Sequence, residues 1–352
     1  MKNSAERELG SLAAVRDGSG PASWGEGSWH QSDVKKYPTT NAEFNELESL
    51  INQYCLEGHA PAAPLLNKSG SVIAIGSCFA AELRHFLNDV GLSSDSFWIP
   101  SGLNNTFALL DFFSWAVTGE QTGKGYGYNK TSNGDIVDWQ PSFEQQQYKD
   151  ALAHASSFVF TLGLAEVWED KESGKVFWRG VPERIFNEGR HHFRLSSVQE
   201  NTENLENIVA LIRQINPNAP IVFTVSPVPL KATFGSKSCI TSDCVSKSTL
   251  RLAINDYMSK TDCSSNVYYW PSFEIVKWVG CHLPYPVYGT DDGCVRHVSR
   301  FLVTQILKAF VNCYYGMETA EDVFKEYLST LETRDGNLGE PPKIYLGQIV
   351  KA

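Results

Sequence analysis

Short apolar runs alternate along the chain with longer amphipathic segments. The runs are rich in Val, Ile, Phe and Tyr and end at Gly, Ser or Pro, a pattern that predicts buried strands. They cover residues 71–75, 157–162, 220–225 and 267–270. Because each side of such a strand is apolar, both faces of the sheet are expected to be covered.

Helical spacing of apolar residues predicts the segments that provide this cover. They are residues 41–56, 79–90, 201–215, 246–259 and 297–314. Strands that alternate with helices are typical of a parallel sheet. The sequence therefore predicts an α/β fold, a three-layer α/β/α sandwich with a central parallel sheet.

The chain divides into one large domain and two flanks. Residues 1–40 are rich in Gly, Ser and charge and predict a flexible leader. The α/β domain is expected over residues 41–320, with insertions near a functional site at about 119–147 and at 168–193, the second a hairpin. Residues 321–352 are expected to form a C-terminal tail.

Composition and charge narrow the possible partners. Of the 352 residues, 42% are hydrophobic and 20% are charged, so the chain has enough apolar residues to form a hydrophobic core. A net charge of −10 gives no general attraction to nucleic acid or to an anionic membrane. No run reaches the roughly 18 apolar residues of a membrane span, and the N-terminus lacks the apolar core of a signal peptide. We therefore expect a cytoplasmic protein without a nucleic-acid partner; its oligomeric state stays open.

The eight cysteines show neither a CxxC pair nor a regular spacing. This pattern favours reduced thiols over disulfides or a zinc site, so no metal is expected. No GxxxxGK[ST] or GxGxxG sequence follows any predicted strand, which argues against a nucleotide-dependent enzyme.

The strongest local feature is the sequence IGSCFA at residues 75–80, where the first strand turns into a helix. Gly76 permits a tight turn, and Ser77 is suited to cap the helix. Cys78 would lie where the helix dipole stabilises a thiolate. The alternative is an ordinary capping serine followed by a small buried cysteine.

The second feature is the segment 289–299, directly before the last predicted helix. His297 follows Asp291 and Asp292, so it is a candidate general base whose ring a carboxylate orients. The alternative is a surface or capping histidine. Catalysis is favoured if the sheet brings this loop and the turn of Cys78 to one edge.

Two other strand ends and one turn carry polar residues. Gly163 and Glu166 follow the second strand, and Ser226 follows the third, where ordinary turn chemistry is the favoured reading. Residues 102–105 contain Gly102, Asn104 and Asn105, which could donate hydrogen bonds to an oxyanion. The two asparagines could equally cap the helix that follows them.

Several of these blocks together resemble the GSCFA family. Besides IGSCFA, the sequences TLGLAEVW (161–168), TVSPVPLKATF (224–234), FEIV (273–276) and RHVS (296–299) look like the family's later blocks in the same order. The family is similar in arrangement to SGNH hydrolases, also called GDSL esterases. The resemblance thus implies a flavodoxin-like three-layer fold that carries acyl-ester chemistry.

Carried over residue by residue, the resemblance places Cys78, and not Ser77, at the nucleophile position, with Gly76 in the oxyanion turn and His297 as the base. The Gly-x-Asn-Asp block of SGNH enzymes falls on residues 163–166, where the usual Asn is missing and Glu166 ends the block. Asn104 or Asn105 would then complete the oxyanion hole. Cys294 stands three residues before the histidine, where the family pattern of SGNH enzymes has an Asp, so Asp292 or Asp291 would have to replace it.

The resemblance implies an O-acyltransferase or esterase that acts on a carbohydrate, since GSCFA-like proteins are associated with bacterial surface-polysaccharide biosynthesis. No bound cofactor is expected, although an acyl donor such as acetyl-CoA could serve as co-substrate. The missing Asn and displaced Asp also fit another class of protein, a catalytically inactive SGNH-like scaffold that binds a glycan or a partner protein. Acylation of Cys78 by an activated ester would separate the two.

Overall fold

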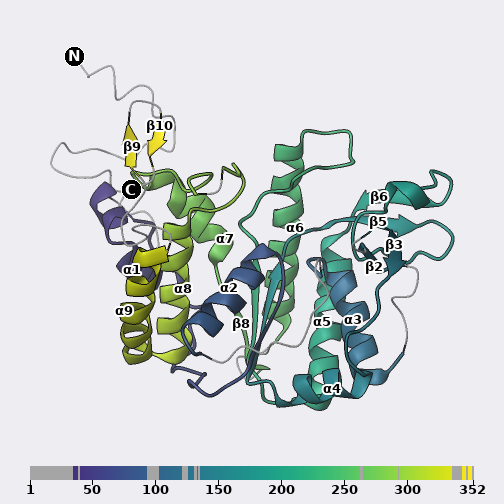
Figure 1. Ribbon diagram of the computed structural model, residues 1–352, viewed down its shortest axis with the longest axis horizontal. Helices are drawn as coiled ribbons and strands as arrows, with labels where there is room; N and C mark the ends of the chain where they lie inside the picture. Colours follow the sequence, from purple (N-terminus) through teal and green to yellow (C-terminus); the bar gives the residue numbers. More distant parts are fainter. Residues whose placement is uncertain are drawn as a thin grey trace, which may run out of the picture.

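The computed structural model has a central sheet of four parallel strands with helices on both sides (Figure 1). The strand order is β1-β4-β7-β8. The strands are β1 (Val72–Gly76), β4 (Ser157–Leu162), β7 (Ile221–Val225) and β8 (Val267–Tyr269). The structure describes residues 35–38, 40–92, 103–120, 126–130, 133, 135–261, 265–291, 293–334, 343–345 and 348–350. All four strands lie where the sequence predicts them, and the α/β fold is confirmed.

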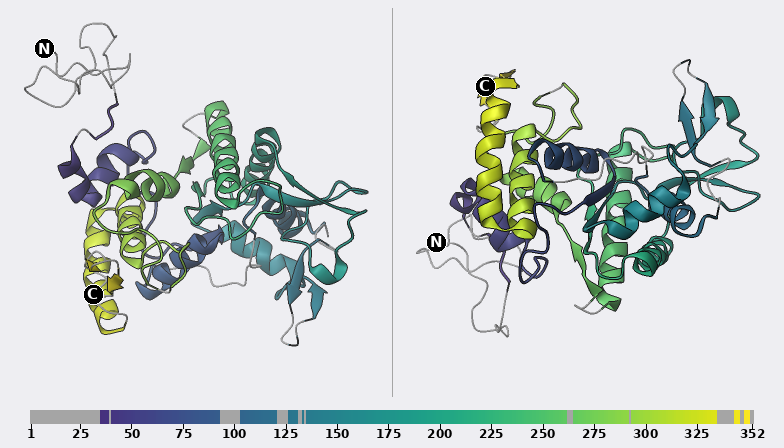
Figure 2. Two further views of the ribbon diagram at one scale, coloured as in Figure 1. Left: turned by 90° about the horizontal axis from the view of Figure 1, so that it is seen from above. Right: turned by 60° about the horizontal axis from the view of Figure 1, so that its bottom comes forward.

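Alternate strand residues face two separate cores. Val72 and Ala74 of β1 belong to one hydrophobic cluster, whereas Ile73 and Ile75 belong to the other. The first cluster includes α2 (Cys78–Asp89), α8 (Arg300–Tyr315) and α9 (Met317–Arg334). The second includes α3 (Thr106–Thr118), α4 (Gln145–His154), α5 (Val198–Ile215) and α6 (Cys239–Lys260). The sheet is therefore the middle of three layers, as seen from above in Figure 2.

Several helix boundaries differ from those expected. The segment 41–56 is not one helix but a 3₁₀ turn, η2 (Asn41–Asn45), the short α1 (Leu47–Leu50) and a π-helical turn, η3 (Ile51–Cys55). The break falls at Glu46, whose ψ of 72° is not helical. Helix α8 begins at Arg300 and not at residue 297, because the Ser299 side chain accepts a hydrogen bond from the Leu302 N–H (3.3 Å) and caps it.

The sequence did not predict α4 and α9, and it placed a helix after the two asparagines without bounds, where α3 lies. Helix α3 is apolar on nearly all sides, so it shows no stripe, and α4 begins with three glutamines. Helix α9 runs through residues 317–334, across the position where a tail was expected to begin. Its residues Ala320, Val323 and Phe324 are buried, and the Phe324 ring stacks on Phe86 of α2 at 5.0 Å. Apolar packing therefore explains the helix.

Both expected insertions contain hairpins. In the first, β2 (Tyr128–Lys130) pairs with β3 (Ile136–Asp138). In the second, β5 (Glu166–Asp170) pairs with β6 (His191–Leu195), and Trp168 lies opposite Phe193. The remaining elements are short: η4 (Glu183–Ile185), α7 (Ser272–Glu274), η6 (Ile275–Val279), η7 (Gly280–His282), β9 (Lys343–Tyr345) and β10 (Gln348–Val350). Among the described helices, none combines the length and apolar character needed to cross a membrane.

Candidate functional site

The turn after β1 is pressed against the end of β4. Gly76 has a φ of +131°, and a Cβ atom there would lie 2.2 Å from the Thr161 carbonyl oxygen. The next N–H, that of Ser77, reaches both the carbonyl oxygen (3.0 Å) and the Oγ1 (2.7 Å) of Thr161. Only glycine fits this close approach. The turn is thus fixed by backbone packing.

Ser77 and Cys78 have different roles in this turn. Ser77 is the N-cap of α2, because its Oγ accepts the Phe79 N–H at 3.3 Å and also lies 2.9 Å from Thr161 Oγ1. Cys78 is the first residue of the helix, and it is exposed. Its thiol therefore lies at the positive end of the helix dipole and is open to solvent. The capping role expected for Ser77 is present, whereas Cys78 is not a buried hydrophobic residue.

Asn104 and Gly163 lie beside this turn. The N–H groups of Gly163 and Leu164 both donate to the Asn104 carbonyl oxygen, at 2.7 and 3.1 Å. A Cβ atom on Gly163 would lie 3.5 Å from both the Cβ and the Nδ2 of Asn104, and 3.6 Å from the Ser77 Cβ. The structure thus brings Ser77, Asn104 and Gly163 together at the carboxyl edge of the sheet.

Asn105 is turned away from this edge, so its expected role as an oxyanion donor is corrected. Its Oδ1 accepts the Ala108 N–H (2.8 Å) and caps α3, while its Nδ2 donates to the Trp178 carbonyl oxygen (3.1 Å). Because the side chain is buried and both ends are paired, it cannot serve an oxyanion. Of the two asparagines, Asn104 remains a candidate. Gly102 lies outside the described residues.

Glu166 is the first residue of β5, close behind Gly163. Its Oε1 accepts a hydrogen bond from Thr233 Oγ1 at 2.8 Å. Burial raises the pKa of this carboxyl above its usual value, and the nearby Asp243 adds to the rise. Ser226 is buried after β7, and its Oγ accepts the Val228 N–H at 3.4 Å. Ser226 is therefore a turn residue, as favoured from the sequence.

The loop that carries His297 lies over the segment following β7. Tyr288 Oη donates to the Pro227 carbonyl oxygen at 2.9 Å, and the Arg296 guanidinium donates to that of Pro229 at 2.8 Å. The His297 backbone closes the loop, since its carbonyl oxygen accepts the Gly289 N–H at 2.9 Å. The side chain of His297 is half-buried. The loop and the turn of Cys78 thus lie at the same edge of the sheet.

One of the two carboxylates expected to orient His297 has another role here. Asp291 Oδ2 accepts hydrogen bonds from Thr290 Oγ1 (2.8 Å) and from the Arg300 N–H (2.9 Å), so it caps the start of α8. Asp292, the other candidate, lies outside the described residues. Cys294, three residues before His297, is half-buried, and its carbonyl oxygen accepts the His297 N–H at 2.9 Å.

Lys247 is a residue of this edge that the sequence reading missed. It is only 1% exposed, and its Nζ donates to the Gly163 carbonyl oxygen at 2.7 Å. Burial lowers its pKa to about 8. Its position three residues before Leu250 and seven before Ile254 places it on the apolar face of α6, where both are buried. A lysine on an apolar stripe is the signal that would have identified it.

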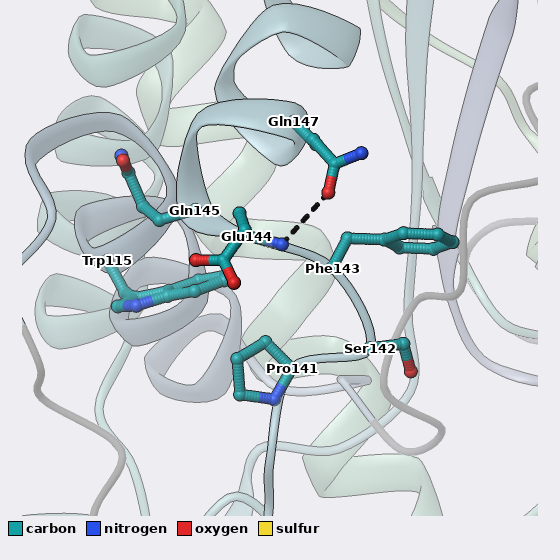
Figure 3. A pocket seen from close by; sticks show the side chains of 7 residues that line it. All are labelled: Trp115, Pro141, Ser142, Phe143, Glu144, Gln145 and Gln147. Carbon is teal, nitrogen blue, oxygen red and sulfur yellow. Dashed lines mark hydrogen bonds between the residues drawn. The ribbon is translucent and has the colours of Figure 1, made fainter.

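A surface pocket elsewhere in the molecule is lined by none of the candidate site residues. It is formed by Trp115, Pro141, Ser142, Phe143, Glu144, Gln145 and Gln147 (Figure 3). There Gln147 Oε1 accepts the Glu144 N–H at 3.1 Å, as part of the cap of α4. Helix α4 lies at the bottom of Figure 1 and leads into the amino end of β4, opposite the candidate site. In the described part of the chain, no three His, Cys, Asp or Glu side chains are placed to hold a metal ion.

The fold and this edge define an α/β sandwich with an exposed thiol at the start of a helix. The profile of the GSCFA family matches residues 71–310, from β1 into α8. This is well over half of the chain, and the chain therefore belongs to the GSCFA family. Comparisons with curated proteins and with solved structures gave no significant match.

Proposed function

We propose that this protein is an SGNH-like acyl-ester enzyme, an O-acyltransferase or esterase, with Cys78 as the nucleophile and His297 as the base. The observation that carries the proposal is the setting of Cys78. It is an exposed thiol at the start of α2, directly after Gly76 and Ser77, and Ser77 lies beside Asn104 and Gly163. Family membership adds that the motif around this turn is the family's own.

In the proposed reaction, Cys78 Sγ attacks the acyl carbonyl carbon and His297 takes the thiol proton. The bond from the carbonyl carbon to the alcohol oxygen then breaks, and His297 returns the proton to that oxygen. In the second step, water or a sugar hydroxyl attacks the thioester and gives its proton to His297, which passes it to the leaving thiolate. The acceptor decides between hydrolysis and transfer.

The negative charge on the tetrahedral intermediate needs donors near the thiol. Amide N–H groups in the first turn of a helix have no partner within the helix, so that of Cys78 is suited to this role. The second donor we propose is Nδ2 of Asn104, which lies beside Gly163 and Ser77. Asn104 would then replace the Asn that the block at 163–166 lacks.

The substrate we propose is a carbohydrate. If the enzyme is an esterase, the carbohydrate is O-acylated and loses its acyl group to water; if it is a transferase, a free hydroxyl of the carbohydrate accepts the acyl group from acetyl-CoA or a similar thioester, which leaves as the thiol. The cytoplasm is the location we propose. The association of GSCFA-like proteins with surface polysaccharides supports this choice of substrate.

One observation favours a second candidate function, an inactive scaffold that binds a glycan or a partner protein. Asp291, one of the two carboxylates expected to orient the base, instead caps α8. A Cys-His pair nevertheless functions without a third member, because a thiolate needs less activation than an alkoxide. The enzyme is therefore the preferred proposal.

The test is the intact mass of the protein after brief incubation with p-nitrophenyl acetate. We expect one acetyl adduct on Cys78 and release of p-nitrophenol beyond the first turnover. The adduct should be absent from Cys78→Ala and present in Cys244→Ala, a control at an exposed cysteine of α6. Equal labelling of Cys78 and Cys244 would instead support the scaffold.

A further inference from the structure

A buried ammonium group contacts the candidate site from behind. Lys247 lies on α6, and its Nζ donates a hydrogen bond to the carbonyl oxygen of Gly163 at 2.7 Å. Next to it, Ser246 Oγ accepts the N–H of Ala165 at 2.9 Å. Two neighbouring residues of one helix therefore hold the turn at both ends. The proposed reaction does not otherwise use either of them.

A single peptide group, that between Gly163 and Leu164, connects Lys247 to Asn104. The Gly163 carbonyl that accepts from Lys247 belongs to the same peptide unit as the Leu164 N–H, which donates to the Asn104 carbonyl oxygen at 3.1 Å. An ammonium group that polarises a peptide carbonyl strengthens the donor on the other side of the peptide. Charge on Lys247 thus strengthens the attachment of Asn104.

We propose that Lys247 is a positioning residue of the acyl-transfer site: its ammonium group, acting through the Gly163–Leu164 peptide, fixes Asn104 so that Nδ2 faces the developing oxyanion on the Cys78 adduct. This inference rests on the proposed function. Lys247 itself touches neither the thiol nor the substrate in this scheme.

The charged groups around Lys247 come from three elements. Asp243 lies one turn earlier on α6 and favours the ammonium form, whereas Lys277 of η6 disfavours it. Burial is the largest influence and lowers the pKa of Lys247 to about 8. Asp243 also raises the pKa of the Glu166 carboxyl on β5. Tyr288 covers Lys277, whose Nζ lies 5.0 Å from the ring centre. The ammonium is therefore lost at mildly alkaline pH.

A purely structural role would not need a charge at this position. A buried ammonium group with one hydrogen bond to a carbonyl is costly, and an apolar side chain of the same length avoids that cost. Lys247→Met is consequently expected to fold, with a midpoint of thermal unfolding within about 3 °C of that of the wild type. Lys325→Met, at an exposed position of α9, is the matched control.

The first experiment observes Asn104 directly and needs no turnover. The protein is labelled with ¹⁵N-asparagine, the signals of Asn104 are assigned with Asn104→Gln, and the pH is raised from 6 to 10. In the wild type and in Lys325→Met, we expect a step in the Asn104 signals with a midpoint near pH 8, the pKa of Lys247. The step should be absent from Lys247→Met. The Asn105 side chain, which is anchored elsewhere, should not show it.

The second experiment measures steady-state turnover of p-nitrophenyl acetate. We expect kcat of Lys247→Met to be about 10-fold lower with KM unchanged, which is the signature of an interaction made in the transition state. We expect wild-type kcat to fall above pH 8, where Lys247 loses its charge, and this fall to be absent from the variant. A wild-type kcat in Lys247→Met, or an Asn104 step that persists there, would overturn the inference. If the wild type is never acylated, the proposed function fails, while the Asn104 titration still decides whether Lys247 is coupled to that residue.

Discussion

The two halves of the candidate site are held in place by different means. The turn of Cys78 is fixed by its backbone, because Gly76 lies against Thr161 more closely than any other residue allows. The loop of His297 is held by side chains that reach across to the segment after β7, from Tyr288 and from Arg296. Gly293 lies within this loop, and a Cβ atom added to it would have no other atom within 4 Å. One half is rigidly packed, and the other is tethered.

Because of this difference, mutations are expected to affect the two halves in different ways. The position of a packed turn depends on one glycine and is insensitive to most side chains around it. The loop of His297 has a close glycine of its own, since Gly289 has a φ of +72° and a Cβ there would lie 3.1 Å from the Val295 Cα. Its position over the segment after β7, however, depends on hydrogen bonds from side chains. Each lost bond lets the loop move, and misplacement of a base by about 1 Å is enough to slow a reaction greatly. Mutations should therefore affect folding at the turn and rate at the loop.

The largest effect is expected for Gly76→Ala. Its Cβ would overlap the Thr161 carbonyl oxygen, and the φ of +131° is one that alanine avoids. We expect a loss of more than about 4 kcal/mol in the free energy of unfolding, or failure to fold. Urea denaturation followed by circular dichroism measures this.

Gly163→Ala is the control at the same edge. A Cβ there meets ordinary van der Waals contacts at 3.5 and 3.6 Å, so its free energy of unfolding should stay within about 1 kcal/mol of the wild type. If the two variants are equally stable, the turn of Cys78 is not packed as described.

The next effect concerns rate and not folding. His297→Ala should lower the rate of Cys78 acylation by p-nitrophenyl acetate about 100-fold or more, since general bases contribute at least that much. Its half-buried ring packs in a tethered loop, so the unfolding midpoint should change little. His85→Ala, at an exposed position of α2, serves as the control and should keep the wild-type rate. A His297→Ala protein that does not fold would assign this histidine a structural role.

The sequence was sufficient for the sheet and for the turn of Cys78. Fully apolar runs identify strands buried on both faces, and a glycine between strand and helix marks the turn. The sequence was insufficient for side chains whose hydrogen-bond partners lie far away along the chain. Asn104 and Asn105 are neighbours of the same type, and only contacts with Gly163 and with Trp178 distinguish them. The role of Asp291 likewise depends on where α8 begins.

The smallest effect is expected for Tyr288→Phe, which removes one of the two tethers of the His297 loop. The Pro227 carbonyl loses its donor, so the free energy of unfolding should fall by about 1 kcal/mol. The acylation rate should fall severalfold, and not 100-fold, because the Arg296 tether remains. Tyr285→Phe is the control in the preceding segment, where the ring packs edge-on against Phe301 at 5.4 Å and this contact survives the substitution. If Tyr288→Phe changes neither rate nor stability, the loop is held by its own backbone bonds, such as that between Gly289 and His297, and the two halves of the site are more alike than their contacts indicate.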